Sequence, residues 1–356
     1  MKIAIAGLNP GTAIYAQYMA KNGHEVTIFT ESQNDVVIAD LLPHVSLNIV
    51  NRESTRLFTR RYLEDILGIR IRNVKLQSIT IDENRIILTN GEYDNYDKVI
   101  IGSEIYPASS GRCISVYSIK SLQGKYLIEG RDAGKNTELL LLIADVGGSV
   151  DTKSALVLDD DVLKSVPINR AQDTQECLST DYEVVKPIIG KIGVNNELLG
   201  RSFVMRDSLS GIEYVVNRDY QLIIMGKLMA LRDLGVINTL PLMPRLELGF
   251  SNNWSFMTIG LTREELGSVF RDLSSSRISY RAVDNDIIAK VLHRGNKLLG
   301  MQVLARGIKL LSWFYLIYSL VMLNDIAYLV LDMGYERVFG TLRGLLEQLV
   351  LNLYNI

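Results

Sequence analysis

The first 31 residues contain the feature that most constrains the fold of this chain. Residues 2–6 form a short apolar run that is typical of a buried parallel strand. A glycine-containing turn and apolar residues at helical spacing follow over 7–22, and Gly23 ends this predicted helix. A second apolar strand over 26–30 leads into Glu31. The pattern predicts a β-α-β unit of the dinucleotide-binding kind, with an acid about 20 residues past the turn.

Length, composition and charge limit the classes of protein to which this chain can belong. A chain of 356 residues predicts two or three domains, and 47% hydrophobic residues indicate a folded protein. A net charge of -2, with scattered Lys and Arg, argues against nucleic-acid binding. Cys113 and Cys177 are far apart in sequence, which fits a reducing cytoplasm and speaks against a disulfide framework. The three histidines form no metal-ligand pattern.

One segment, Ile308–Leu323, is apolar enough to be considered as a membrane span. Its uninterrupted apolar part is shorter than the roughly 20 residues that a spanning helix needs. We therefore expect a buried or dimer-forming helix and no membrane span. Because the N-terminus enters a strand directly and has no signal-peptide pattern, we expect a cytoplasmic protein.

The rest of the chain predicts further strands and helices. Residues 96–101 form another buried strand, which ends at Gly102 and Ser103. A second α/β unit is predicted with its first strand at 139–144 and its turn at 145–149. The C-terminal part predicts a hairpin of two strands and then two helices, over 287–293, 298–304, 308–323 and 342–353.

The order of these segments resembles the pyridine nucleotide-disulfide oxidoreductase family, in the branch of coenzyme A-disulfide reductase and NADH oxidase. Besides the N-terminal unit, three stretches carry the resemblance: Gly91–Pro107, Phe256–Leu266 and Leu298–Phe339. The resemblance implies an α/β fold with two Rossmann-like domains, one inserted in the other, and a C-terminal α+β dimerisation domain. The implied ranges are 1–107 and 230–270 for the FAD-binding-like domain, 108–229 for the NAD-binding-like domain and 271–356 for the interface domain.

The resemblance also implies a set of cofactor-binding residues, for FAD or an adenine nucleotide. Gly7 and Gly11 belong to the phosphate turn, in which two family glycines are replaced. Glu31 matches the acid that binds ribose, although a solvated carboxylate at a strand end is the alternative. Gly102 and Ser103 match the second FAD contact.

Several family features have no match in this chain. The redox cysteine falls at Asp40 or Leu41, neither of which forms a thiolate. The NAD turn aligns with 144–151, where Asp145 sets a negative charge against the pyrophosphate, which argues against NAD(P) binding. The Gly-Asp of the FAD site is not found. We expect Met225-Gly226 to end the strand before it, and the resemblance implies the loss of several tens of residues between Leu234 and Trp254.

The leading hypothesis is therefore a pseudoenzyme, a non-catalytic structural or regulatory subunit with no catalytic residue, no metal and either no cofactor or FAD. It would form a homodimer, or a heteromer with an intact relative, through its C-terminal domain. The alternative is an FAD-dependent NAD(P)H oxidase or disulfide reductase with altered motifs. A third interpretation, from Gly11 and Glu31 alone, is a module that binds ADP or AMP without redox chemistry.

Overall fold

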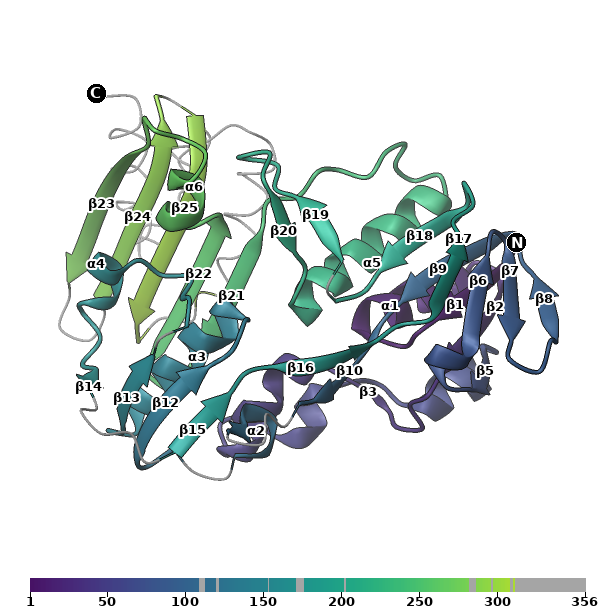
Figure 1. Ribbon diagram of the computed structural model, residues 1–356, viewed down its shortest axis with the longest axis horizontal. Coiled ribbons are helices and arrows are strands. Elements are labelled where there is room, and N and C mark those ends of the chain that lie inside the picture. The colour runs from purple at the N-terminus through teal and green to yellow at the C-terminus, as the bar shows by residue number, and fades with distance from the viewer. Residues whose placement is uncertain are drawn as a thin grey trace, which may run out of the picture.

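The computed structural model describes residues 1–108, 113–119, 122–152, 154–170, 176–201, 203–281, 286–295, 297–307 and 310. Three five-stranded sheets dominate this part of the chain (Figure 1). Apart from Leu310, the two predicted C-terminal helices lie outside the described residues. None of the described helices is long and apolar enough to cross a membrane.

The first sheet is parallel and confirms the N-terminal β-α-β prediction. Its strand order is β18-β9-β1-β2-β5, with bounds Asn196–Leu199, Lys98–Gly102, Lys2–Ala6, Glu25–Thr30 and Arg70–Asn73. Side chains of β1 alternate between two cores, as the pleat of a strand requires. Ile3 and Ile5 pack in one core with the helices, whereas Ala4 and Ala6 pack in the other.

Helices α1 (Pro10–Lys21) and α5 (Asp219–Asp233) pack closely against each other on one face of this sheet (Figure 1). Their contact depends on two facing glycines. A Cβ atom on Gly226 would lie 2.2 Å from the carbonyl oxygen of Gly11, and one on Gly11 would lie 2.5 Å from the carbonyl oxygen of Leu222. The glycine at the start of α1 therefore has a packing role that is independent of any cofactor.

A Gly226→Ala variant should lower the free energy of unfolding by about 1–3 kcal/mol, because the added methyl group meets backbone that must move. Thermal unfolding of the variant measures this loss. Gly267→Ala, at the end of α6 (Arg263–Gly267), is the control because nothing lies within 4 Å of the added atom. Equal stability of Gly226→Ala and the wild type would contradict the close packing.

A four-stranded sheet packs on the other face of the first sheet, since Ile79, Ile81 and Ile86 share a core with Ala4 and Ala6. Strands β6, β7 and β8 form an antiparallel meander, with bounds Ile79–Asp82, Arg85–Leu88 and Tyr93–Asn95, and β17 (Ile188–Lys191) pairs with β6 in parallel. Three two-stranded pairs join β3 to β4, β10 to β16 and β19 to β20, with bounds Val36–Val37, Arg56–Phe58, Glu104–Pro107, Tyr182–Val185, Val204–Arg206 and Glu213–Val215.

The second sheet corrects the predicted second α/β unit. It is parallel, in the order β11-β15-β12-β13-β14, with bounds Ile114–Ser115, Glu176–Ser179, Lys125–Glu129, Ser149–Thr152 and Asn169–Arg170. The apolar run 139–144, predicted as a strand, lies in helix α3 (Ala133–Asp145). The unit is therefore β12-α3-β13, and its turn is 130–132 rather than 145–149.

The two cysteines, which the sequence analysis took as far apart and unlinked, form a disulfide in this part of the fold. Cys113 precedes β11 and Cys177 lies on β15, which pairs with β11, and their Cα atoms are 4.5 Å apart. The prediction that speaks against a disulfide was wrong because it used sequence separation, whereas the parallel pairing brings the two residues together.

The third sheet is antiparallel and contains the predicted hairpin. Its order is β21-β22-β25-β24-β23, with bounds Leu246–Phe250, Trp254–Gly260, Lys297–Arg306, Asp286–Arg294 and Ser274–Arg281. The chain leaves the first sheet after β9, forms the second sheet, and returns at β18 before the third begins. The sheets thus divide the chain differently from the predicted ranges. The range 108–229 was predicted for the NAD-binding-like domain, but it includes β18, which is a strand of the first sheet, and most of α5, which packs on that sheet.

Candidate functional site

The turn between β1 and α1 lies at the carboxyl end of the first sheet, where open parallel sheets bind ligands. Gly7 has a φ of +105°, which favours glycine. A Cβ atom on Gly7 would lie 2.8 Å from the carbonyl carbon of Gly102, and one on Gly102 would lie 2.4 Å from the Gly7 oxygen. Both glycines are therefore needed for β1 and β9 to meet, with or without a ligand.

The side chain of Asn9 occupies the N-terminus of α1. Its Oδ1 accepts hydrogen bonds from the backbone N–H groups of Gly11 and Thr12, at 2.9 and 3.0 Å. Its Nδ2 donates to the carbonyl oxygens of Ser103 and Leu199. A helix N-terminus offers such N–H groups to phosphate, and here the protein's own side chain already binds two of them.

The carboxylate of Glu104 accepts a hydrogen bond from a third backbone N–H group of the same turn, that of Leu8. Its Oε1 accepts from the backbone N–H of Leu8 at 3.1 Å and from the hydroxyl of Thr30, and its Oε2 accepts from Tyr106. Glu104 is only 4% exposed. A buried carboxylate at this turn repels a pyrophosphate and also occupies one of its donors.

Glu31 and Ser103, the remaining predicted binding residues, make contacts within the protein. Glu31 Oε1 accepts from the backbone N–H of Leu76 at 2.7 Å. The Ser103 hydroxyl donates to the carbonyl oxygen of Arg201 at 3.3 Å. The five predicted residues thus gather near one end of the sheet, as expected, but each already has a structural role there. Their part in cofactor binding stays a prediction.

The structure corrects the strand that was predicted to precede the Gly-Asp position. Met225 and Gly226 lie inside α5, so the prediction that they end a strand is wrong. β18, the edge strand beside β9, is instead followed by Gly200 and Arg201. A Cβ atom on Gly200 would lie 2.4 Å from the Ser103 hydroxyl oxygen.

Arg201 forms a buried ion pair with the residue at the predicted redox-cysteine position. Its Nη2 lies 2.9 Å from Asp40 Oδ1 and 2.7 Å from Asp219 Oδ1, and the arginine side chain is 1% exposed. Asp40 belongs to the short 3₁₀ helix Ala39–Leu41, and Asp219 begins α5. Asp40, at the predicted redox-cysteine position, is therefore held in a buried salt bridge.

Burial and charge act in opposite directions on the two aspartates. Burial raises the pKa of Asp40, but Arg201, Lys135 and Arg218 more than offset it and hold that pKa below its usual value. Burial raises the pKa of Asp219, and its neighbour Asp40 raises it further. Of the two aspartates, Asp40 therefore has the lower pKa.

The turn before α3, which corresponds to an NAD turn, is packed inside the protein. Asp132 caps the helix and accepts from the backbone N–H of Lys135 at 2.9 Å. A Cβ atom on Gly134 would lie 2.2 Å from Glu247 Oε2 and 2.5 Å from Arg218 Nη2. Protein side chains therefore fill the space next to the helix N-terminus, where a pyrophosphate would need room.

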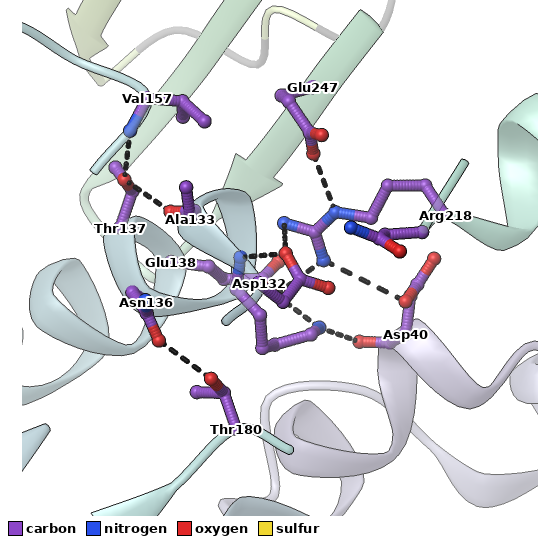
Figure 2. A network of polar contacts seen from close by, with 12 residues as sticks. Asp40, Asp132, Ala133, Asn136, Thr137, Glu138, Val157, Thr180, Arg218 and Glu247 are labelled. Atoms are coloured by element: carbon purple, nitrogen blue, oxygen red, sulfur yellow. Dashed lines mark hydrogen bonds and ion pairs between the residues drawn. The ribbon is translucent and has the colours of Figure 1, made fainter. Parts of the chain in front are cut away.

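Arg218 is the centre of this buried cluster (Figure 2). Its Nε lies 2.7 Å from Glu247 Oε2, and the guanidinium also lies within 4 Å of Asp40, Glu138 and Asp132. Because these residues come from the N-terminal segment, α3, the start of α5 and β21, Arg218 links the parts of the chain that form the three large sheets.

Comparison with solved structures finds one fold repeatedly. No family model and no curated protein matches this sequence. Reduced CoADR-RHD of Bacillus anthracis matches with a TM-score of 0.72 at 14% identity, over 99% of this chain and 80% of that chain. The NAD-dependent persulfide reductase of A. fulgidus matches with a TM-score of 0.73 at 12% identity, over 99% and 83%. The water-forming NADH oxidase of Lactobacillus brevis matches with a TM-score of 0.70 at 12% identity, over 100% and 99%.

The chain has the fold of the pyridine nucleotide-disulfide oxidoreductases. The resemblance predicted from sequence is confirmed at this level. At these identities the likeness shows the fold alone, so the chemistry must be judged from the residues of this chain.

A cavity of 230 Å³ remains at the carboxyl end of the first sheet. Its walls come from the phosphate turn, the segment after β2, β10 and the residues around Arg201, and include Leu8, Asn9, Val36, Ser103, Ile105, Tyr117, Tyr182 and Asp219. Pockets for drug-sized ligands span about 300–1,000 Å³, and FAD is larger than such ligands. Together with the occupied N–H groups, this volume means that the site as arranged does not fit FAD.

Sequence analysis did not identify Asn9, Glu104, Arg201 and Arg218 as site residues. A polar residue before a helix is a capping signal, so Asn9 had a local signature. The pairing of Arg201 with Asp40 joins residues 161 positions apart, and no local pattern could have revealed it.

One further group of metal-ligand types occurs among the described residues, at Cys113, Glu129 and Cys177. The disulfide uses both sulfur atoms, and a thiolate is needed to bind a metal. This group therefore gives no metal site in the oxidised protein, and the prediction of no metal stays a prediction.

Proposed function

We propose that this protein is a non-catalytic relative of the flavin disulfide oxidoreductases and works as a structural or regulatory subunit. The observation that carries the proposal is the Glu104 carboxylate on the backbone N–H of Leu8, inside the phosphate turn. An anion that the protein supplies itself competes with the pyrophosphate for the same donor. The Arg201–Asp40 pair supports the proposal, because it holds Asp40, at the predicted redox-cysteine position, in a buried salt bridge.

We also propose that the protein does not bind NAD(P). The negative charge of Asp145 does not support this proposal, because Asp145 lies at the end of α3 and not in the turn before it. The turn that does precede α3 contains the capping Asp132, and Gly134, in the first turn of α3, packs against Glu247. A carboxylate cap and a filled groove both oppose binding of a dinucleotide.

An absorbance scan from about 300 to 550 nm tests the proposal. We expect no flavin bands in freshly purified protein and none after incubation with FAD and removal of the excess, and we expect no oxidation of NAD(P)H. Thermal unfolding with FAD, ADP or AMP should give no shift, because the turn is occupied. Stoichiometric flavin, or a saturable shift with ADP, would overturn the proposal.

A Glu104→Gln variant separates charge from shape in this test. The amide keeps the size of the side chain and removes the negative charge from the turn. If repulsion alone keeps nucleotides out, the variant should gain a saturable thermal shift with ADP that the wild type lacks. Absence of a shift in both proteins is expected if Asn9 and the small cavity also exclude the nucleotide.

The alternative function is an FAD-dependent NAD(P)H oxidase or disulfide reductase with altered motifs. Gly7, Gly11 and Glu31 near the carboxyl end of the first sheet favour it, since they stand where the family binds FAD. It requires Glu104 and Asn9 to leave the turn when the cofactor binds, and it predicts a yellow protein.

The assembly remains part of the proposal. A homodimer, or a heteromer with an intact relative, would use the C-terminal region as an interface, and a subunit without chemistry of its own needs such a partner. The proposal that one domain is inserted in the other, and that the C-terminal domain is a dimerisation domain, rests on the fold likeness. The cytoplasmic location stays a prediction, and the Cys113–Cys177 disulfide removes the cysteine argument for it.

A further inference from the structure

The disulfide between Cys113 and Cys177 lies beside a carboxylate. The sulfur atom of Cys113 is 3.6 Å from Glu129 Oε2, and the two sulfur atoms and a carboxylate oxygen all lie within 4.8 Å of one another. Cys113 is 8% exposed, Cys177 is half-buried and Glu129 is exposed, so the group reaches the surface. Two cysteine sulfurs and a carboxylate oxygen are ligand types that proteins use for zinc.

The register of the second sheet places the three side chains on one face. Cys113 precedes β11 and stands beside Cys177 of β15, with their Cα atoms 4.5 Å apart. Cys177 in turn stands opposite Leu127 of β12. Glu129 lies two residues after Leu127, and residues i and i+2 of a strand share a face. Three adjacent segments of the chain therefore direct their potential ligands the same way.

The opposite face of the same strands packs in the protein core. Ile128 and Leu178, which are next in sequence to Glu129 and Cys177, are buried in one cluster with the leucines of α3. Because successive side chains of a strand point to opposite faces, the face with the sulfur atoms points away from α3. An ion can therefore approach this face without disturbing that core.

The redox state decides whether these atoms can bind a metal. In the oxidised protein the two sulfur atoms bond each other, and coordination needs thiolates. A dithiol reductant breaks the bond by exchange: its two thiols become a disulfide, and their hydrogen atoms pass to the two cysteines. Rotation of the freed side chains can then separate the sulfur atoms to about 3.7 Å, the spacing that a Zn–S distance of about 2.3 Å and a tetrahedral angle require.

The charges of the reduced group favour a divalent cation. The carboxylate of Glu129 opposes the formation of thiolates beside it, because like charges would meet within a few ångströms. A bound divalent ion offsets this repulsion and releases both thiol protons to solvent. Ca²⁺ and Mg²⁺ prefer oxygen ligands, and Cu(I) prefers sulfur ligands alone. Zinc binds both thiolate and carboxylate, so the mixed set fits zinc.

We propose that the reduced protein binds one Zn²⁺ through the thiolates of Cys113 and Cys177 and the carboxylate of Glu129, with water in the fourth position. The metal then replaces the disulfide as the link between β11 and β15, and the edge of the second sheet is held in both redox states. The prediction of no metal would apply to the oxidised protein only. This inference goes beyond the proposed function and does not depend on it, because the phosphate turn belongs to the first sheet.

Titration of the reduced full-length protein tests this inference. The protein is reduced with a dithiol, freed of the reductant under nitrogen gas, and titrated with Zn²⁺ in competition with a coloured chelator. We expect one zinc per chain with a dissociation constant on the order of 1 µM, weaker than four-ligand structural sites. The oxidised protein should bind at least about 100-fold more weakly, because it has no thiolate. No saturable binding by the reduced protein, or equal binding by the oxidised protein, would overturn the inference.

A matched pair of carboxylate variants tests the third ligand. Loss of an outer-shell partner alone costs about 10–100-fold in metal affinity, so Glu129→Gln should weaken zinc binding at least about 10-fold. Asp151→Asn is the control, because Asp151 lies opposite Leu127 on β13, on the same face but one strand further from Cys177. It should change the affinity less than about two-fold, as a screened surface charge. Equal effects of the two variants would reject Glu129 as a ligand.

Cobalt binding and unfolding give two further measurements. Co²⁺ in place of Zn²⁺ should give a thiolate-to-metal charge-transfer band, which a Cys113→Ser/Cys177→Ser variant should lack. Zinc should also raise the urea midpoint of the reduced wild type, and a chelator should reverse this gain, because a ligand of the native state stabilises that state. A cobalt complex of the reduced wild type without thiolate bands would place the metal on other ligands and overturn the inference.

Discussion

An Arg218→Met variant is expected to lose about 3–5 kcal/mol of unfolding free energy, because it removes a cation that lies within salt-bridge distance of four buried carboxylates at once. Among the described contacts, Glu247 lies 2.7 Å from the guanidinium, and Asp40, Glu138 and Asp132 lie at 3.7, 3.8 and 3.9 Å. Methionine fills much of the same volume, so the loss reports charge rather than a cavity.

Urea unfolding of the wild type and the variant measures the difference. Arg61→Met is the control, since Arg61 is 89% exposed and pairs with Asp65 on the surface. That pair should contribute less than about 1 kcal/mol. A loss below about 1 kcal/mol for Arg218→Met would mean that the surrounding carboxyl groups take up protons and that the cluster needs no cation.

Adding Glu247→Gln to Arg218→Met sharpens the interpretation. Burial raises the pKa of Glu247, which opposes its ionisation once the guanidinium is gone. Replacing this carboxylate should therefore recover part of the lost stability. A further loss in the double variant would instead show that Glu247 contributes through packing and its contact with the Tyr220 hydroxyl.

The N-terminal β-α-β unit was predictable because its signals are local. Strand, turn, helix and second strand follow within 30 residues, and each has its own pattern of apolar residues and glycines. The C-terminal hairpin was predictable for the same reason. Local patterns therefore gave the correct elements wherever the alternation or the helical period was clear.

The second α/β unit shows where such patterns fail. Residues 139–144 are apolar on every side, so periodicity cannot distinguish a buried strand from a buried helix. The deciding signals lie at the ends of the segment, where Asp132 caps α3 and Gly147 follows it with a φ of +73°. Reading these two residues as a cap and a stop would have predicted the helix.

The occupied site was beyond sequence reasoning for a different reason. Arg201 and Asp40 lie 161 positions apart, and no local pattern of residues indicates that their side chains form an ion pair. Since the two residues meet only through the fold, the structure was needed to recognise the pair.

Removal of the Cys113–Cys177 disulfide is the second change expected to have a large effect. The bond closes a loop with a sequence separation of 64, and the chain-entropy relation gives about 4 kcal/mol for a loop of this length. β11 is held to β15 by only two register pairs, Ile114 with Leu178 and Ser115 with Ser179. Without the bond, the edge of the second sheet depends on these pairs and on apolar packing.

A Cys113→Ser/Cys177→Ser double variant and urea unfolding measure this contribution. A dithiol reductant should destabilise the wild type to the level of the double variant and leave the double variant unchanged. Because the chain contains two cysteines, a thiol assay of unfolded protein should find no thiol before reduction and two after it. Wild-type protein that resists the reductant while its thiols become reactive would contradict a stabilising role.

The same thiol assay decides between two environments for this protein. Disulfides persist in oxidising compartments and are rare in the cytosol of mesophiles. Protein trapped directly from its native cell should therefore show no reactive thiol if it works in an oxidising compartment. Two reactive thiols in the trapped protein would instead restore the cysteine argument for a reducing cytoplasm. The protein would then work in its reduced form, without the stabilisation that the disulfide contributes.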